Sequence, residues 1–143
     1  MSSTSSSNTA PAPTVWPVLG YADAPALIEF LAKAFGLEEV LTVPGETEGE
    51  IMHAELAWPC GGGVMLSSLS AGKDHPERPA GASSLYAVTD DPDGLFARAT
   101  AAGAEVVRPI RDEDYGNRSF IVRDPEGNLW SFGYYRGQPR PAS

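Results

Sequence analysis

Apolar and polar positions in the first part of the chain alternate between strand-like and helix-like spacing. Segment 15–21 has the composition of a strand, and segment 24–35 has an apolar face with helical periodicity. The apolar residues of that face are Leu27, Ile28, Leu31 and Phe35. Asp23 is suited to cap the start of this helix, Pro25 suits its first turn, and Gly36 is suited to end it. With a further strand at 38–43, the pattern predicts strand, helix and strand in succession.

The same order returns in the second part of the chain. Strands are predicted at 85–88 and 105–109, with a helix at 95–102 between them. Asp90 or Asp91 is the expected cap, and Gly103 is the expected end. Asp90 follows Asp23 by 67 residues (90 − 23), and Gly103 follows Gly36 by the same 67 residues (103 − 36). The chain therefore has the pattern of a duplicated unit.

The offset also relates two pairs of later segments. Segment 51–58 lies opposite 118–125, and each leads through a glycine-containing turn into another short strand, at 64–68 and 129–135. Each half is thus predicted to be a βαβββ module.

These modules define the expected domain organisation. The working domain is predicted at 14–135, with module one at 14–68 and module two at 83–135. A Ser-, Gly- and Pro-rich connector, 69–82, joins them. The terminal segments 1–13 and 136–143 have little to bury and are predicted to be disordered tails.

Composition narrows the class of protein. The 143 residues, with 42% hydrophobic and 20% charged, fit one globular domain. No apolar run approaches the roughly 18 residues that cross a bilayer, and the N-terminus has no features of a signal peptide, so we expect a cytoplasmic protein without membrane partners. The net charge of −9 argues against nucleic acid and would favour a cationic ligand, although it also fits a solvated acidic surface. The lone Cys60, between Pro59 and Gly61, is interpreted as a structural turn residue.

Three stretches resemble the vicinal oxygen chelate superfamily, the glyoxalase, bleomycin resistance protein and dioxygenase proteins. They are VLGYADAPALIEFLAKAFGLEEV, HAELAWPCGGGVMLS and, most specifically, DEDYGNRSFIVRDPEGNLWSFGYY. The resemblance implies an α+β fold in which two βαβββ modules form curved mixed sheets, with the helices outside. It also implies a homodimer, because small members often build each cup from modules of both chains.

The resemblance further implies where a metal would sit, on the first and last strands of each module. The corresponding positions are Trp16, Ser83 and Ser131, with Leu66 or Ser67 as the fourth. None is a histidine or carboxylate, the side chains that hold divalent metals in such sites. The chain has only two histidines, His53 and His75, too few for both first strands. We therefore predict neither metal nor other cofactor.

Strand alternation predicts the residues of the cup. Ile51, His53 and Glu55 share one strand face, and the offset places Arg118 and Phe120 at the equivalent positions of module two. The predicted lining is Trp16, His53, Glu55, Ser83, Arg118, Phe120 and Ser131.

Each of these residues has a chemical and a structural interpretation. His53 and Glu55 could serve as a catalytic acid-base pair, or only stabilise the sheet. Trp16 offers a face for stacking on planar ligands or for a cation-π contact. Arg118 could bind an anionic ligand group or pair with Glu55 or Asp124.

The leading functional hypothesis is a metal-independent protein that binds and sequesters a drug or a planar or cationic metabolite. The rival hypothesis is a glyoxalase-like lyase or isomerase that uses His53 and Glu55, or a metal site aligned differently from the one above. A scaffold with a degenerate pocket is the third alternative.

Overall fold

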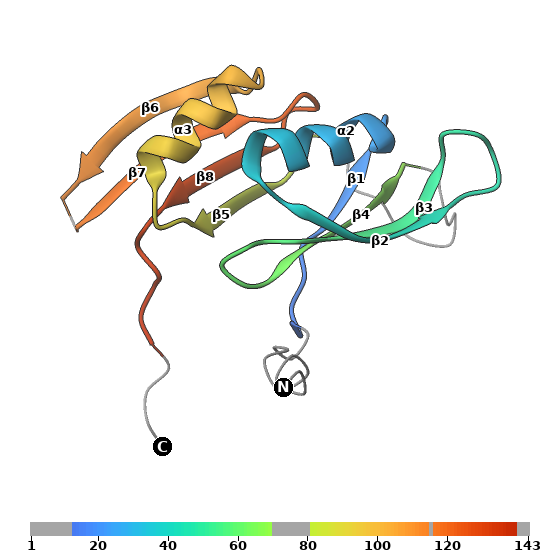
Figure 1. Cartoon of the computed structure of the whole chain (residues 1–143), viewed down its shortest axis with the longest axis horizontal. Coiled ribbons are helices and arrows are strands. Elements are labelled where there is room, and N and C mark those ends of the chain that lie inside the picture. Colours follow the sequence, from blue (N-terminus) through green and yellow to red (C-terminus); the bar gives the residue numbers. More distant parts are fainter. Residues whose placement is uncertain (1–12, 70–80, 115, 140–143) are drawn as a thin grey trace, which may run out of the picture.

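The first half of the chain forms one four-stranded mixed sheet with the order β1-β4-β3-β2 (Figure 1). Strand β1 pairs in parallel with β4, and the other neighbours are antiparallel. The elements are β1 (Val18–Tyr21), α2 (Ala24–Phe30), η1 (Leu31–Phe35), β2 (Glu38–Pro44), β3 (Ile51–Ala57) and β4 (Gly63–Ser68). This computed structural model describes residues 13–69, 81–114 and 116–139.

The second half repeats this arrangement with the sheet order β5-β8-β7-β6. Its elements are β5 (Ser84–Val88), α3 (Pro92–Ala101), β6 (Glu105–Glu113), β7 (Asn117–Arg123) and β8 (Leu129–Gly133). Strand β5 pairs in parallel with β8, as β1 does with β4. The prediction of two βαβββ modules in mixed sheets is confirmed.

Local sequence signals set the ends of both helices. The Asp23 carboxylate accepts a hydrogen bond from the Ala26 N–H at 3.3 Å, and Asp91, rather than Asp90, accepts one from Gly94 at 3.1 Å. Gly36 ends the first helix with φ of 86°, a left-handed conformation that glycine adopts without steric cost.

The first helix differs from the predicted regular helix in its last part. The α-helical portion ends at Phe30, and Leu31–Phe35 has the wider hydrogen bonding of a π-helix. Its carbonyl groups are bound from module two, because the Arg98 guanidinium on α3 donates to the Lys33 carbonyl at 2.9 Å and the Ala32 carbonyl at 3.1 Å. The two helices are thereby joined, and Figure 1 shows them on the same side of the two sheets.

Aromatic side chains from both modules pack beneath the helices. The Phe35 ring of module one lies 5.0 Å from Trp130 and 4.9 Å from Phe132 of module two, measured between ring centroids. All three side chains are buried, and the cluster they belong to continues through both sheets. Alternation along 129–135 predicts that Trp130, Phe132 and Tyr134 share one helix-facing, core side. Trp130 and Phe132 are buried as predicted, but the prediction is wrong for Tyr134, which lies beyond the end of β8 and is exposed.

The predicted N-terminal tail 1–13 and the 69–82 connector, including His75, lie largely outside the described residues. Of the predicted C-terminal tail, 140–143 lies outside them, while Arg136 is described and pairs with Asp90. In the part of the chain that the structure describes, no helix has the length and apolar character needed to cross a membrane.

Candidate functional site

The sequence-predicted lining does not form one site, but it contains one close pair. On β3, the His53 Nε2 and Glu55 Oε2 atoms lie 2.8 Å apart. Their neighbours Ala54 and Leu56 are fully buried toward the helices, so alternation places His53 and Glu55 on the opposite, open face of the first sheet. Both side chains are only partly exposed. The contact between these two residues is what an acid-base pair requires, and it is equally what a structural ion pair requires.

The prediction that Arg118 and Phe120 line the cup is wrong. Phe120 is fully buried, and its ring lies 5.0 Å from Phe96 on α3. Arg118 shares this helix-covered side, where its guanidinium donates two hydrogen bonds of 3.0 Å to Asp93 and one of 3.1 Å to Asp112. These bonds from Arg118 lower the pKa of the Asp93 carboxyl. Arg118 also pairs with neither of the partners that the sequence suggested.

The error comes from the offset between the modules. The helix caps Asp23 and Asp91 are 68 residues apart (91 − 23). In the third strands, however, the buried residues Ala54 and Phe120 are equivalent, because they pair with the buried Leu66 and Phe132 of the last strands. That offset is 66 (120 − 54), and a change of one residue from the assumed 67 exchanges the two faces of a strand.

The other predicted lining residues are separated in the fold. Trp16 precedes β1, where its indole N–H donates to the Pro13 carbonyl at 3.0 Å. Ser131 lies on the open face of the second sheet, between Tyr86 and Ile121. Ser83 lines a shallow groove between β1 and β5, and its backbone N–H donates to the Asn128 side chain at 3.0 Å. Only His53 and Glu55 are brought together.

The open face of the second sheet carries a separate charged cluster. The Arg108 guanidinium lies 3.0 Å from the Glu113 carboxylate and donates to the Ser119 hydroxyl at 2.7 Å. Arg111 also contacts Glu113, at 3.2 Å, and its hydrogen bond is the main cause that lowers the pKa of the Glu113 carboxyl. Because these charges satisfy one another, the cluster has the character of a structural network.

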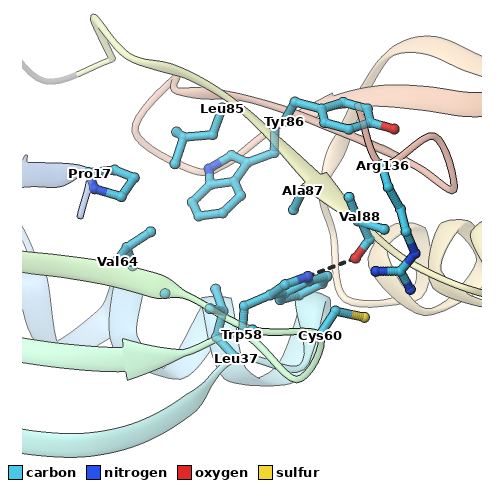
Figure 2. Close-up of a pocket in the computed structure, with 13 residues that line it drawn as sticks. Pro17, Leu37, Trp58, Cys60, Val64, Leu85, Tyr86, Ala87, Val88 and Arg136 are labelled. Carbon is cyan, nitrogen blue, oxygen red and sulfur yellow. Dashed lines mark hydrogen bonds between the residues drawn. The ribbon is translucent and has the colours of Figure 1, made fainter. Parts of the chain in front are cut away.

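A pocket of about 270 Å³ lies where the two modules meet. Module one contributes the segment before β1 and the turn between β3 and β4, and module two contributes β5, Trp130 and Arg136 (Figure 2). Slightly more of the wall surface is apolar than polar, and the aliphatic lining residues are Pro17, Leu37, Val64, Leu85, Ala87 and Val88. None of the seven sequence-predicted lining residues belongs to this pocket.

The aromatic residues that line this junction pocket are Trp58, Trp130 and Tyr86, and Figure 2 shows the Tyr86 ring directed away from Trp58. The Trp58 indole N–H donates to the Val88 carbonyl at 2.7 Å, across the module boundary, which fixes the ring in place. Alternation along 51–58 predicts Trp58 on the core-facing side, and its ring does pack against the core, 5.7 Å from Phe132. The signal for its additional role in the pocket is its position after the end of β3, next to a turn in which Gly61 and Gly62 adopt positive φ angles.

Two polar side chains also line the pocket. Arg136 follows β8, and its guanidinium lies 3.0 Å from the Asp90 carboxylate. Cys60 is an exposed free thiol in the β3–β4 turn, as its neighbours predicted. Figure 2 shows the Arg136 side chain extending along Val88, toward the end of the pocket formed by Trp58 and Cys60.

Behind the pocket, a buried carboxylate holds one wall in position. Asp124 Oδ2 accepts hydrogen bonds from the Tyr21 hydroxyl at 2.6 Å and from the Trp130 indole N–H at 3.1 Å. Its Oδ1 accepts from the backbone N–H groups of Glu126 and Asn128. Burial, and then the nearby Asp124 charge, raise the pKa of the Tyr21 hydroxyl above its usual value, so Tyr21 remains a donor. This network fastens β1 of module one to the Trp130 wall.

The next acidic residue of the same turn also binds module one. The two carboxylate oxygens of Glu126 accept hydrogen bonds from the Ala22 and Asp23 backbone N–H groups, each at 2.7 Å. These groups lie at the start of α2, where a negative charge is favourable. The residue types at 124–128 predict a turn that satisfies its own backbone geometry, and in the structure this turn also joins the two modules.

The described residues do not fit a metal centre. Trp16, Ser83 and Ser131 supply no imidazole or carboxylate, and His53 and Glu55 lie on a different sheet from Ser131. Within 13–69, 81–114 and 116–139 there is no group of three or more His, Cys, Asp or Glu side chains suited to holding an ion.

Solved structures with this architecture include TioX from Micromonospora sp. ML1, which is 33% identical, with a TM-score of 0.68 over 85% of this chain and 98% of that one. An integron cassette protein from Vibrio cholerae is 23% identical, with a TM-score of 0.63 over 89% of this chain and 99% of that one. At this lower identity the likeness shows the fold alone.

The sequence itself is similar to mycobacterial proteins. Uncharacterized proteins of Mycobacterium bovis and Mycobacterium tuberculosis are each 35% identical over 127 residues, which is 85% of this chain and, respectively, 82% and 74% of theirs. The model of the Glyoxalase/Bleomycin resistance protein/Dioxygenase superfamily matches residues 15–132. The chain therefore belongs to the glyoxalase/bleomycin resistance protein/dioxygenase superfamily.

Proposed function

We propose that this chain is a metal-independent small-molecule-binding protein that sequesters a planar drug or metabolite in the junction pocket. The observation that supports this function is the pocket itself, which Trp58 and Trp130 line together with six aliphatic residues. Pockets of this character are the usual sites of small-molecule recognition. Pockets that hold drug-sized ligands have volumes of about 300–1,000 Å³, so a pocket of about 270 Å³ suits a smaller ligand of one or two rings.

Isothermal titration calorimetry with 2-naphthamide, a neutral two-ring probe, tests this proposal. Protein dialysed against EDTA should bind the probe with the same Kd as protein supplied with zinc, because the pocket walls contain no metal-ligand set. Binding that is lost in EDTA and restored by a metal ion would contradict the proposal. A lysozyme titration run in the same buffers controls for nonspecific uptake of the probe.

We also propose that the chain forms a homodimer through its open sheet faces. Three apolar side chains of the first sheet, Val18, Leu41 and Val43, are exposed on the face that carries His53 and Glu55. Val18 is 68% exposed, which favours burial against a second copy.

Sedimentation velocity should give the mass of two chains, and Val18→Asp should shift the protein to one chain because it places a charge in the buried contact. A wild-type protein that sediments as a monomer at all concentrations would contradict the dimer. Val15→Asp is the matched control, because Val15 is exposed and precedes the strand.

A lyase or isomerase is the second candidate function, and the 2.8 Å contact between His53 and Glu55 favours it. If these residues exchange protons with a substrate, His53→Gln should lower turnover of an active compound by about 100-fold or more. The melting temperature of the variant should change little, because both side chains are partly exposed.

The assay is a screen of α-keto aldehyde and glutathione hemithioacetal substrates, followed by mass spectrometry. Turnover that survives in both His53→Gln and Glu55→Gln would exclude this pair as the catalytic one. In the binding-protein account, both variants retain the wild-type affinity for 2-naphthamide, since neither residue lines the junction pocket.

A further inference from the structure

We infer that the ligand of the junction pocket is a small aromatic carboxylate, whose rings lie against Trp58 and whose carboxylate binds Arg136. This inference rests on the proposed binding function and specifies its ligand class. The ligand is thereby assigned a negative charge in addition to a planar shape.

The pocket's charge distribution supports an anion. Among the described residues that line the pocket, Arg136 is the one that carries a full charge at neutral pH. The remaining walls are aliphatic or aromatic, apart from backbone groups and the Cys60 thiol. A neutral ligand would form no ion pair with the guanidinium, and a cation would be placed beside a like charge. An aromatic ring with a carboxylate at one end matches both parts of the lining.

The present partner of Arg136 can be exchanged for a ligand group. Asp90 contacts Arg136 at 3.0 Å, but the side chains of Arg136 and Asp90 are 60% and 79% exposed. Exposed ion pairs of this kind contribute little free energy, about 0–1 kcal/mol. A ligand carboxylate held by ring stacking beside Arg136 would form a paired, charge-assisted contact that is partly shielded from water.

The Trp58 ring is oriented for this arrangement. Its N–H is already bound to the Val88 carbonyl, so the ligand needs no acceptor there and can use the face of the ring. Figure 2 shows Arg136 and Trp58 on either side of the Val88 carbonyl, which places an apolar surface next to a cation. A planar acid can therefore contact both residues at once.

The inferred charge is opposite to the one that the net charge of −9 favours. That net charge acts over distance, and salt screens it beyond about 8 Å at physiological ionic strength. Arg136 acts at contact distance, well within that screening length, although its side chain is 60% exposed. The local cation therefore decides which ligand is held.

Calorimetry with three isosteric probes tests the inference. The probes are 2-naphthoate, neutral 2-naphthamide and cationic 2-naphthylmethylammonium. Wild-type protein should bind the carboxylate about tenfold more tightly than the amide, and the ammonium most weakly. Arg136→Gln should remove the preference for the carboxylate and leave the amide affinity unchanged. Asp90→Asn should act in the opposite direction and raise carboxylate affinity by about threefold, because it frees Arg136 from its competitor.

Arg111→Gln is the matched control, since Arg111 is 59% exposed and pairs with Glu113 outside the pocket. It should keep the wild-type preference. Equal binding of carboxylate and amide, or a preference that survives Arg136→Gln, would overturn the charge assignment while leaving the binding function intact. Failure of all three probes to bind wild-type protein would overturn both the inference and the proposed pocket.

Discussion

Replacing Asp124 by alanine is expected to lower the free energy of unfolding by about 3 to 5 kcal/mol, the largest effect of any single change considered. The carboxylate is 4% exposed, and it binds donors from both modules. Alanine would leave the Tyr21 hydroxyl and the Trp130 indole N–H buried without their acceptor, and each such loss costs about 1 to 3 kcal/mol. Urea denaturation followed by circular dichroism measures the change.

Asp112→Ala is the matched control for this effect. The Asp112 carboxylate also accepts a hydrogen bond, from the Arg118 guanidinium at 3.1 Å, but the Asp112 side chain is exposed. Its removal should cost no more than about 1 kcal/mol. If Asp124→Ala lowered the free energy of unfolding by no more than Asp112→Ala does, the Asp124 network would not be what joins the modules.

Replacing Trp58 by alanine is expected to weaken binding of 2-naphthamide by about 30- to 100-fold, which corresponds to about 2 to 3 kcal/mol. The ring forms one wall of the pocket, and an aromatic wall of this kind carries a large share of the binding free energy. Calorimetry measures the loss. Trp58→Phe keeps an aromatic ring but loses the hydrogen bond to Val88. Its affinity for 2-naphthamide should fall between those of the wild-type protein and Trp58→Ala.

Trp16→Ala is the control that separates two possible sites. Trp16 is one of the two aromatic residues, with Phe120, that the sequence places in the cup, and it does not line the junction pocket. It should therefore leave 2-naphthamide binding unchanged. The reverse result, with binding lost in Trp16→Ala and kept in Trp58→Ala, would place the ligand in the cup and contradict the proposed site.

Much of the fold could be predicted from local signals. Asp23 with Gly36, and Asp91 with Gly103, mark the ends of segments whose apolar spacing identifies helices. These signals depend on neighbours within a few residues, so they are readable without the tertiary structure. The duplication followed from their recurrence.

The faces of the strands were less predictable, because a strand has a period of two residues. The offset changes from 68 at the caps to 66 in β7, and an error of one residue placed Phe120 and Arg118 on the wrong side. In β3, by contrast, the pattern was read directly, and His53 and Glu55 were placed together as the structure has them.

The junction pocket could not be predicted, since it depends on how the modules meet. Trp58 and Val88 are 30 residues apart, and Tyr21 and Asp124 are 103 apart, with no sequence pattern that pairs them. From the local sequence alone, Trp58 is predicted to be a core residue and Asp124 a turn residue. Their second role arises from contacts between modules.

The central claim is that a planar ligand binds at the junction pocket without a metal ion. The most direct measurement is a ¹⁵N–¹H correlation spectrum of the protein in EDTA, titrated with 2-naphthoate. The account predicts the largest shifts at the Trp58 indole N–H and at the backbone amides of 85–88 and 136, with little change at 53–55. Shifts concentrated at His53 and Glu55, or absent until a metal ion is added, would contradict it.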